Sequence, residues 1–163
     1  MKMTFRWFGE KDDSVRLEYI RQIPGITGVA GALFDIPVGD EWPLENILGL
    51  KNQVNGAGLE LEVIESVNIH EDIKLGLPSR DYYIENYKKT IRNLGKAGIK
   101  VICYNFMPVF DWIRSDLAQI LEDSSEAMSY DHNIIAGIDP IKLVEEMESN
   151  SKGFSLPGWE PDR

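Results

Sequence analysis

The sequence predicts an α/β fold in which parallel strands alternate with helices. Three apolar, β-favouring runs begin just after Gly25, Gly58 and Gly98, and each run is too short for an ordinary helix. These glycines are 33 and 40 residues apart, and a strand–helix–strand unit needs about 30 residues. The run after Gly98 is mostly apolar and ends in polar and aromatic side chains ahead of Pro108. Such a run is typical of a strand that is covered on both faces.

The first strand and the first helix are predicted within residues 2–22. Residues 2–9 alternate in polarity, which favours a strand with one apolar face. The side chains on that face are Met3, Phe5 and Trp7. A helix over residues 12–22 follows, because Asp12 and Asp13 can cap its start and Pro24 stops it.

The second strand and the second helix are separated by a loop. Residues 28–35 are rich in Gly and Ala, which indicates a strand that packs closely against a neighbour. Residues 36–42 contain two turn-forming residues, Pro37 and Gly39, and form the loop. The spacing of apolar residues then predicts a helix over residues 44–55.

The third and fourth strands are predicted over residues 59–66 and 99–106. Between them lie a loop over residues 67–78 and a helix over residues 80–94 with one apolar stripe. Because strands and helices alternate along the chain, the strands should be parallel and joined by right-handed crossovers.

The pattern weakens after residue 106. Residues 111–121 favour a short helix, and Asp139-Pro140 is a helix start with a cap and a first-turn proline. Residues 122–137 are polar, and residues 149–163 indicate a loop. Four parallel strands with these additions form either half of a barrel or a small open sheet with two bare edges.

Composition limits the function classes. The chain has 163 residues, 43% of them hydrophobic, which is enough for one domain with its own core. A net charge of -10 without any basic run argues against nucleic acid and anionic membranes as partners. No apolar run approaches the length of about 20 residues that a membrane helix needs. The chain has a single cysteine, Cys103, which we predict to be a buried, unreactive residue of the core. Because one cysteine cannot form a disulfide within the chain, we expect a cytoplasmic setting.

Functional side chains are expected at the carboxyl ends of the strands, where sites form in parallel sheets and barrels. The residues at these ends and in the following loops are Trp7, Gly9, Asp35, Glu65, Ser66, Tyr104 and Asn105, with His70, Glu71, Asp72, Asp111, Trp112 and Arg114. Such a polar and aromatic rim suits a hydroxylated small molecule with a carboxylate.

Each of the main candidates has an ordinary alternative. Glu65 can be the first solvated residue after its strand, and His70 can be a surface residue of a loop. Trp7 can belong to the core, and Asp111 and Arg114 can pair within their own helix. No metal site is predicted, because the two histidines lie far apart and no recognised ligand spacing occurs. The sequence assigns no catalytic residue.

Five segments carry a resemblance to a known family. They are M-K-M-T-F-R-W-F-G (1–9), P-V-G-D-E-W-P-L-E-N-I-L-G-L-K (37–51), V-I-E-S-V-N-I-H-E-D-I-K (63–74), V-I-C-Y-N-F-M-P-V-F-D-W-I-R-S-D-L (101–117) and G-F-S-L-P-G-W-E-P (153–161). In this order they resemble mannonate dehydratase over nearly the whole chain.

The resemblance implies a xylose-isomerase-like TIM barrel, of which residues 1–163 would be the amino-terminal half, an incomplete barrel with about four strands and an extension. It implies a lyase of hexuronate catabolism that converts D-mannonate into 2-dehydro-3-deoxy-D-gluconate and water. It also implies a divalent metal, usually manganese, and a homo-oligomer.

The resemblance covers only the first half of the family's length. It places the family's metal ligands, a His, Cys, His and Asp set, and its acid–base residues in the other half. Residues 1–163 alone are therefore expected to be inactive and to hold none of these ligands. Strand-end geometry within the matching segments favours five residues as substrate contacts: Trp7, Glu65, His70, Asn105 and Arg114.

Two other interpretations are open. The chain could be another member of the same barrel group, such as a sugar isomerase or a metal-dependent endonuclease. The acidic charge argues against the nuclease. Comparing the turnover of mannonate with the turnover of a ketose distinguishes the dehydratase from an isomerase. The chain could also be a non-enzymatic half-barrel that associates with itself to cover its bare strand edges.

Overall fold

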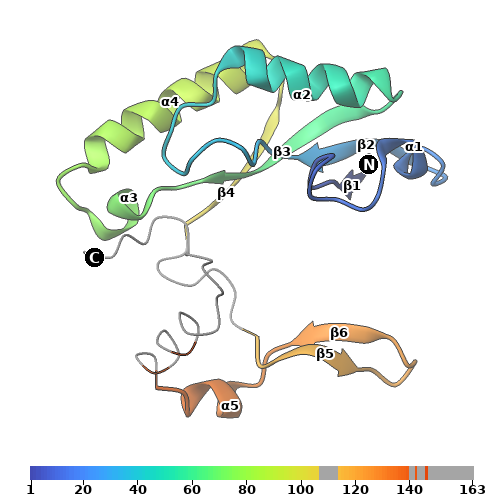
Figure 1. Cartoon of the computed structure of the whole chain (residues 1–163), viewed down its shortest axis with the longest axis vertical. Helices are drawn as coiled ribbons and strands as arrows, with labels where there is room; N and C mark the ends of the chain where they lie inside the picture. Colours follow the sequence, from blue (N-terminus) through green and yellow to red (C-terminus); the bar gives the residue numbers. More distant parts are fainter. Residues whose placement is uncertain (107–113, 140–141, 143–145, 147–163) are drawn as a thin grey trace. The chain divides into compact units, whose positions relative to one another are not determined.

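A computed structural model of the chain describes residues 1–106, 114–139, 142 and 146. The chain divides into two compact units, Met1–Pro108 and Val109–Arg163. Figure 1 shows a sheet with helices in the first unit and a hairpin with a short helix in the second. Within the described residues, no helix is both long and apolar enough to cross a membrane.

The first unit is built on a four-stranded parallel sheet. Its strands lie side by side in chain order: β1 (Met3–Arg6), β2 (Ile26–Gly31), β3 (Glu60–Asn68) and β4 (Val101–Asn105). Every neighbouring pair is parallel, so the predicted α/β class and strand direction are confirmed. The sheet has the form of a partial TIM-barrel-like unit.

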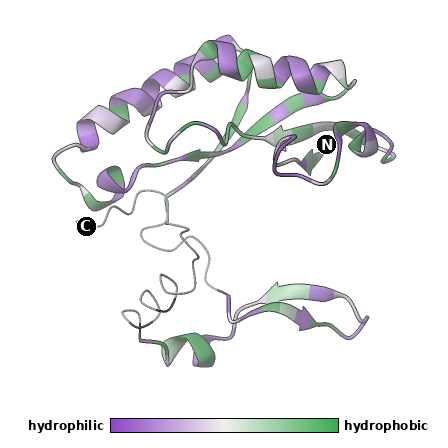
Figure 2. Ribbon diagram, in the orientation of Figure 1, coloured by the Kyte–Doolittle hydropathy of each residue, from purple (hydrophilic) through white to green (hydrophobic). Residues whose placement is uncertain are grey.

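Helices connect the strands and cover the sheet. The helices of this unit are α1 (Leu17–Ile20), α2 (Leu44–Gly56), α3 (Glu71–Leu75) and α4 (Arg80–Lys96). The two long helices, α2 and α4, contact each other and lie over one face of the sheet (Figure 1). Hydrophilic and apolar residues both recur along the length of α4 (Figure 2), as expected for a helix with one face on the core.

The core lies between the sheet and its helices. Each layer contributes fully buried side chains, with Val29 and Ile64 from the strands, Ile47 and Val54 from α2, and Leu94 from α4. Burying one such aliphatic side chain contributes about 1.5–3 kcal/mol. The apolar side chains of the predicted strands therefore pack against the apolar faces of the predicted helices.

The strand register shows which side chains share a face. Phe5, Val29 and Leu61 are aligned across three strands and belong to the core. Arg6 and its partner Ala30 come one position later, so they point to the opposite face. The arrangement places a charged residue on the face away from α2 and α4, at the carboxyl end of β1.

The second unit differs from its prediction. In the described part of residues 111–121 the chain forms a strand, β5 (Asp116–Ile120), which pairs antiparallel with β6 (Glu126–Ser129). The predicted helix is wrong there, because the hairpin turn at residues 121–125 brings two short segments together. A five-residue helix, α5 (His132–Ala136), follows. The helix predicted from Asp139-Pro140 and the loop over 149–163 extend outside the described residues.

Two local predictions in the first unit need correction. The helix predicted over residues 12–22 is only α1, because the Asp13 carboxylate accepts hydrogen bonds from the backbone N–H groups of Phe8 and Val15 instead of capping a helix. The loop predicted over residues 67–78 contains α3.

Cys103 is exposed, so the prediction of a buried thiol is wrong. Its neighbour Ile102 packs against the core, and the alternation of side chains along β4 turns Cys103 to the other face of the sheet. Within the described residues, β4 has only β3 beside it.

We expect Gly28→Ala to lower the free energy of unfolding by about 1–3 kcal/mol. A Cβ atom at Gly28 would lie 2.4 Å from the Glu60 carbonyl oxygen, and this backbone atom is fixed by the sheet. Gly49→Ala in α2 is the matched control, since nothing beyond its own turns of helix lies within 4 Å of its Cβ position. It should raise stability by about 0.5–1 kcal/mol. Urea denaturation followed by circular dichroism measures both, and equal effects would contradict the prediction.

Candidate functional site

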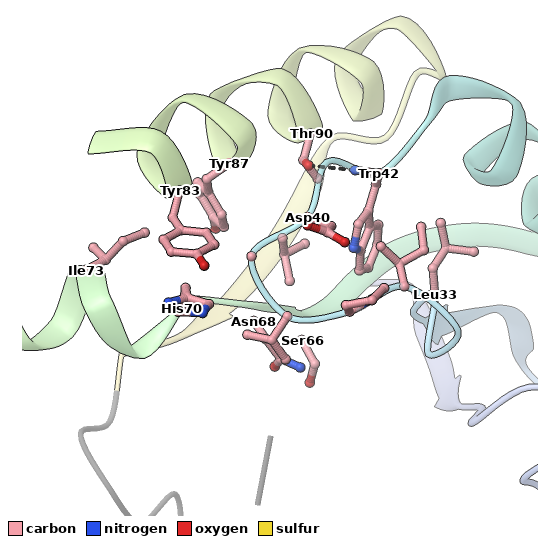
Figure 3. Close-up of a pocket in the computed structure, with 15 residues that line it drawn as sticks. Leu33, Asp40, Trp42, Ser66, Asn68, His70, Ile73, Tyr83, Tyr87 and Thr90 are labelled. Carbon is pink, nitrogen blue, oxygen red and sulfur yellow. Dashed lines mark hydrogen bonds between the residues drawn. The ribbon is translucent and has the colours of Figure 1, made fainter. Parts of the chain in front are cut away.

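A pocket lies at the carboxyl ends of β2 and β3, beneath α4 (Figure 3). Its lining residues surround about 390 Å³ of empty space, which includes open solvent, so the pocket is not an enclosed cavity. Its wall is a loop, residues 36–42, that follows β2 and passes between β3 and α4. The side chains that give the pocket its polar character are Asp40, Ser66, Asn68, His70, Tyr83, Tyr87 and Thr90.

Side chains of α4 hold this loop in place. The side-chain amide of Asn86 donates to the Gly39 carbonyl at 3.1 Å. The Thr90 hydroxyl accepts from the Trp42 backbone N–H at 3.0 Å, and the Asn93 amide donates to the Trp42 carbonyl at 3.0 Å. All three polar side chains are buried. Buried polar groups stabilise a fold only when they are hydrogen-bonded, so these three bonds fix the loop against the helix.

His70 is buried at the pocket, with 7% of its surface exposed. This corrects the alternative of a surface residue. His70 is the N-cap of α3, and its Nδ1 accepts a hydrogen bond from the Asp72 backbone N–H at 3.1 Å. The same Nδ1 lies 3.6 Å from Asp72 Oδ1, beyond hydrogen-bond distance. Because Nδ1 accepts this hydrogen bond, we place the ring N–H on Nε2, which makes Nε2 a hydrogen-bond donor.

The His70 ring stacks on Tyr83, with ring centroids 3.6 Å apart and planes 8° apart. Gly39 lies against both rings, because a Cβ there would come within 2.6 Å of Tyr83 and 2.8 Å of His70. Deeper along α4, burial raises the pKa of the Tyr87 hydroxyl, and nearby Tyr104 adds to the effect. The Tyr87 hydroxyl therefore stays protonated at neutral pH.

A second cluster lies at the carboxyl ends of β1 and β3. Arg6 Nε pairs with Glu65 Oε2 at 3.0 Å. Its Nη1 donates to the carbonyls of Trp7 and Ala30 at 3.1 and 3.3 Å. The guanidinium carbon lies 4.5 Å from the centre of the Phe8 ring, within the range of a cation–π contact.

The five predicted substrate contacts lie in different environments in the structure. Trp7 is in the core, 3% exposed, with its indole N–H donating to the Val15 carbonyl at 3.2 Å. Glu65 and His70 lie at the carboxyl end of β3, where Asn105 of β4 is aligned with Asn68. Arg114 belongs to the second unit, and its role as a substrate contact stays a prediction.

Sequence reasoning missed the roles of Arg6 and Tyr83. The available signal for Arg6 was its place at the end of an alternating strand, where a cation interrupts aromatic residues. No signal in the sequence near Tyr83 could have predicted its role. Its position in a helix does not show that its ring stacks on His70.

No metal centre can be built from the residues that the structure describes. They contain no group of three or more His, Cys, Asp or Glu side chains placed to hold an ion. The geometry instead suits binding of a small polar molecule: an imidazole donor, a carboxylate beside a guanidinium, amides and tyrosine hydroxyls at one edge of a sheet.

We expect Gly39→Ala to lower the free energy of unfolding by about 1–3 kcal/mol more than Gly25→Ala does. Both glycines have left-handed backbones, with φ of +91° and +84°, so the backbone penalty is similar. At Gly25 the nearest atom to a new Cβ is Met3 Sδ at an ordinary 3.7 Å, whereas at Gly39 the stacked rings must move. Urea denaturation of the two variants measures the difference, and equal losses would show that the rings yield freely.

Comparison with known proteins gives a consistent result. The sequence model of the family D-mannonate dehydratase (UxuA) matches residues 1–163. The chain is 69% identical to mannonate dehydratase of Thermotoga neapolitana, covering 100% of this chain and 45% of that protein. It is 64% identical to that of Geobacillus thermodenitrificans, of which it covers 44%.

A solved structure agrees with the sequence comparison. The crystal structure of mannonate dehydratase from Streptococcus suis serotype2 matches with a TM-score of 0.82 and 56% identity. The match covers 92% of this chain and 43% of that chain. The chain therefore spans less than half the length of the relatives that it resembles.

Proposed function

The chain belongs to the D-mannonate dehydratase family, and from this premise we propose that its protein is a lyase that dehydrates D-mannonate. The product is 2-dehydro-3-deoxy-D-gluconate, and the setting is hexuronate catabolism in the cytoplasm. The observation that carries the proposal is the match of the family's sequence model to all 163 residues. The polar cluster at the strand ends supports it, because a sugar acid presents hydroxyls and a carboxylate.

The reaction sets the tasks of the site. A proton leaves C2, the hydroxyl on C3 leaves with a second proton as water, and the resulting enol becomes the ketone by taking a proton at C3. Side chains must therefore hold the hydroxyls of an extended chain and keep water out. In this proposal the His70 Nε2–H donates to a substrate oxygen, and Glu65 and Asn105 bind hydroxyls. Arg114 belongs to the second unit, and its role as a contact for the carboxylate stays a separate prediction.

The direct test is incubation of the protein, at its natural length, with D-mannonate. We expect 2-dehydro-3-deoxy-D-gluconate to form, and nuclear magnetic resonance follows both compounds. A ketose is the control substrate, because a sugar isomerase of the same barrel group would convert it. Conversion of the ketose without conversion of mannonate would contradict the proposal.

We propose a divalent metal, with manganese as the first candidate, as the cofactor of the enzyme. When bound, such an ion polarises carboxylate and hydroxyl oxygens. The described residues contain no fitting set of ligands, so no step is assigned to the metal here. We expect titration of residues 1–163 with Mn²⁺ to give no tight site by calorimetry. One site with a micromolar or lower Kd would contradict this expectation.

The predicted homo-oligomer stays a proposal. Large apolar side chains are exposed on the second unit, among them Leu117 at 75% and Ile120 at 72%, and such surfaces are often covered by a partner. Light scattering of the protein at its natural length determines the state, and a monomer would contradict the proposal.

A further inference from the structure

The cluster around Arg6 is more elaborate than a surface ion pair. The Arg6 side chain is only 23% exposed. Its guanidinium is held on three sides: by Glu65 at 3.0 Å, by the carbonyls of Trp7 and Ala30, and by aromatic rings. The rings of Phe8 and Phe34 stack 6.2 Å apart, and the Arg6 guanidinium lies over both.

The backbone of β3 is shaped at the same place. Ser66, next to Glu65, has a φ of +68°, a conformation that residues other than glycine rarely adopt. The pairing of β3 with β4 also shifts between Ile64 and Val67. Bulges of this kind redirect side chains beside active sites. Two independent features, the bulge and the bound guanidinium, thus act on the direction of one carboxylate.

From this geometry we propose that Arg6 is a positioning residue that fixes the Glu65 carboxylate for a substrate hydroxyl. Arg6 engages Oε2 of Glu65, and Oε1 accepts a hydrogen bond from the sugar acid. The Glu65 side chain is 45% exposed, so an incoming ligand can reach it. The inference rests on the proposed function and deepens it, since it assigns one hydroxyl contact and the group that orients it.

A lysine cannot replace Arg6 in this arrangement. The guanidinium is planar and forms several hydrogen bonds in a fixed fork, whereas an ammonium is a point charge on a flexible stem. We therefore expect Arg6→Lys to keep the charge and lose the orientation. A misplacement of about 1 Å at a reacting group can lower the rate about 100-fold.

The test is a double-mutant cycle on mannonate turnover by the protein at its natural length. The variants are Arg6→Lys, Glu65→Gln and the double variant. We expect Arg6→Lys to lower kcat about 10- to 100-fold while KM changes less than about threefold. The double variant should be no slower than Glu65→Gln alone, because Arg6 acts through Glu65.

The control is a second ion pair on the same two segments of chain. Lys2 Nζ pairs with Glu62 at 2.5 Å, toward the amino ends of the strands, where no site is expected. Lys2→Met should leave kcat and KM unchanged. Melting curves of all variants show whether they fold, and Arg6→Gln replaces Arg6→Lys if the lysine variant does not.

Each other result overturns the inference. Wild-type kcat in Arg6→Lys would mean that Arg6 orients nothing. Losses that multiply in the double variant, or a loss confined to KM, would mean that Arg6 binds the substrate itself. A wild-type protein that does not convert mannonate would contradict the proposed function, and this inference would fall with it.

Discussion

Replacing Trp7 with alanine should lower the free energy of unfolding by about 3–5 kcal/mol, the usual range for a large aromatic residue in a core. Trp7 is 3% exposed and packs within the main hydrophobic cluster. Its removal would leave a cavity, and the Val15 carbonyl would lose the hydrogen bond from the indole N–H. Whole domains are stable by only about 5–15 kcal/mol, so this single change would remove a large share. Urea denaturation followed by far-ultraviolet circular dichroism measures the loss.

Trp7→Phe is the matched control for that experiment. Phenylalanine keeps one six-membered ring in the core but loses the fused ring that carries the indole N–H, so the cost should be nearer 1–3 kcal/mol. The same variant separates the two roles considered for Trp7. A kcat and KM close to wild type would support a core residue, whereas a tenfold rise in KM would support a substrate contact. A loss in Trp7→Ala below 1 kcal/mol would contradict the core role.

The sheet could be predicted because its signals are local. Glycine-led apolar runs mark the strands, and the helical stripe between them marks α2 and α4, whose observed bounds differ from the predicted ones by two residues or fewer. The crossover rule then fixes the strand direction without any knowledge of distant contacts.

The elements that were missed depend on contacts between distant residues. The five-residue helix α3 is too short to give a periodic pattern. Its cap, His70, is buried only because Tyr83 and Gly39 lie against the ring. β5 is wholly exposed, and in the part of the chain that the structure describes it pairs only with β6, so apolar periodicity could not distinguish it from a helix.

In the candidate site, too, the features that could be predicted are local, and those that were missed depend on contacts between distant residues. The strand-end rule selected Glu65, His70 and Asn105, which lie at the carboxyl ends of β3 and β4 or just beyond. It could not select Arg6 as the partner of Glu65, because the place of the guanidinium depends on carbonyls and rings from other segments. Position along a strand is readable from sequence, whereas the partner of a side chain is not.

Loss of the His70 imidazole should lower kcat/KM for mannonate about 100-fold, the lower end of what a positioned acid–base or donor group contributes. Two variants test the stacked ring and the helix cap of His70 separately. His70→Phe keeps a ring to stack on Tyr83 and loses both nitrogens. His70→Asn loses the ring, but its side chain can still cap α3. Because neither variant has the Nε2–H donor, turnover should fall in both.

The two His70 variants should lose stability for different reasons, although kcat/KM should fall in both. Without its cap, α3 in His70→Phe should be destabilised by about 1 kcal/mol, whereas His70→Asn loses the stacked ring instead. Tyr83→Phe is the matched control for stability, since it keeps the stack on His70 and removes only a hydroxyl, so its free energy of unfolding should stay within about 1 kcal/mol of wild type. If kcat/KM of both His70 variants stays within about threefold of wild type while their stability falls, His70 serves the fold of the pocket and the donor must be sought elsewhere along the strand ends.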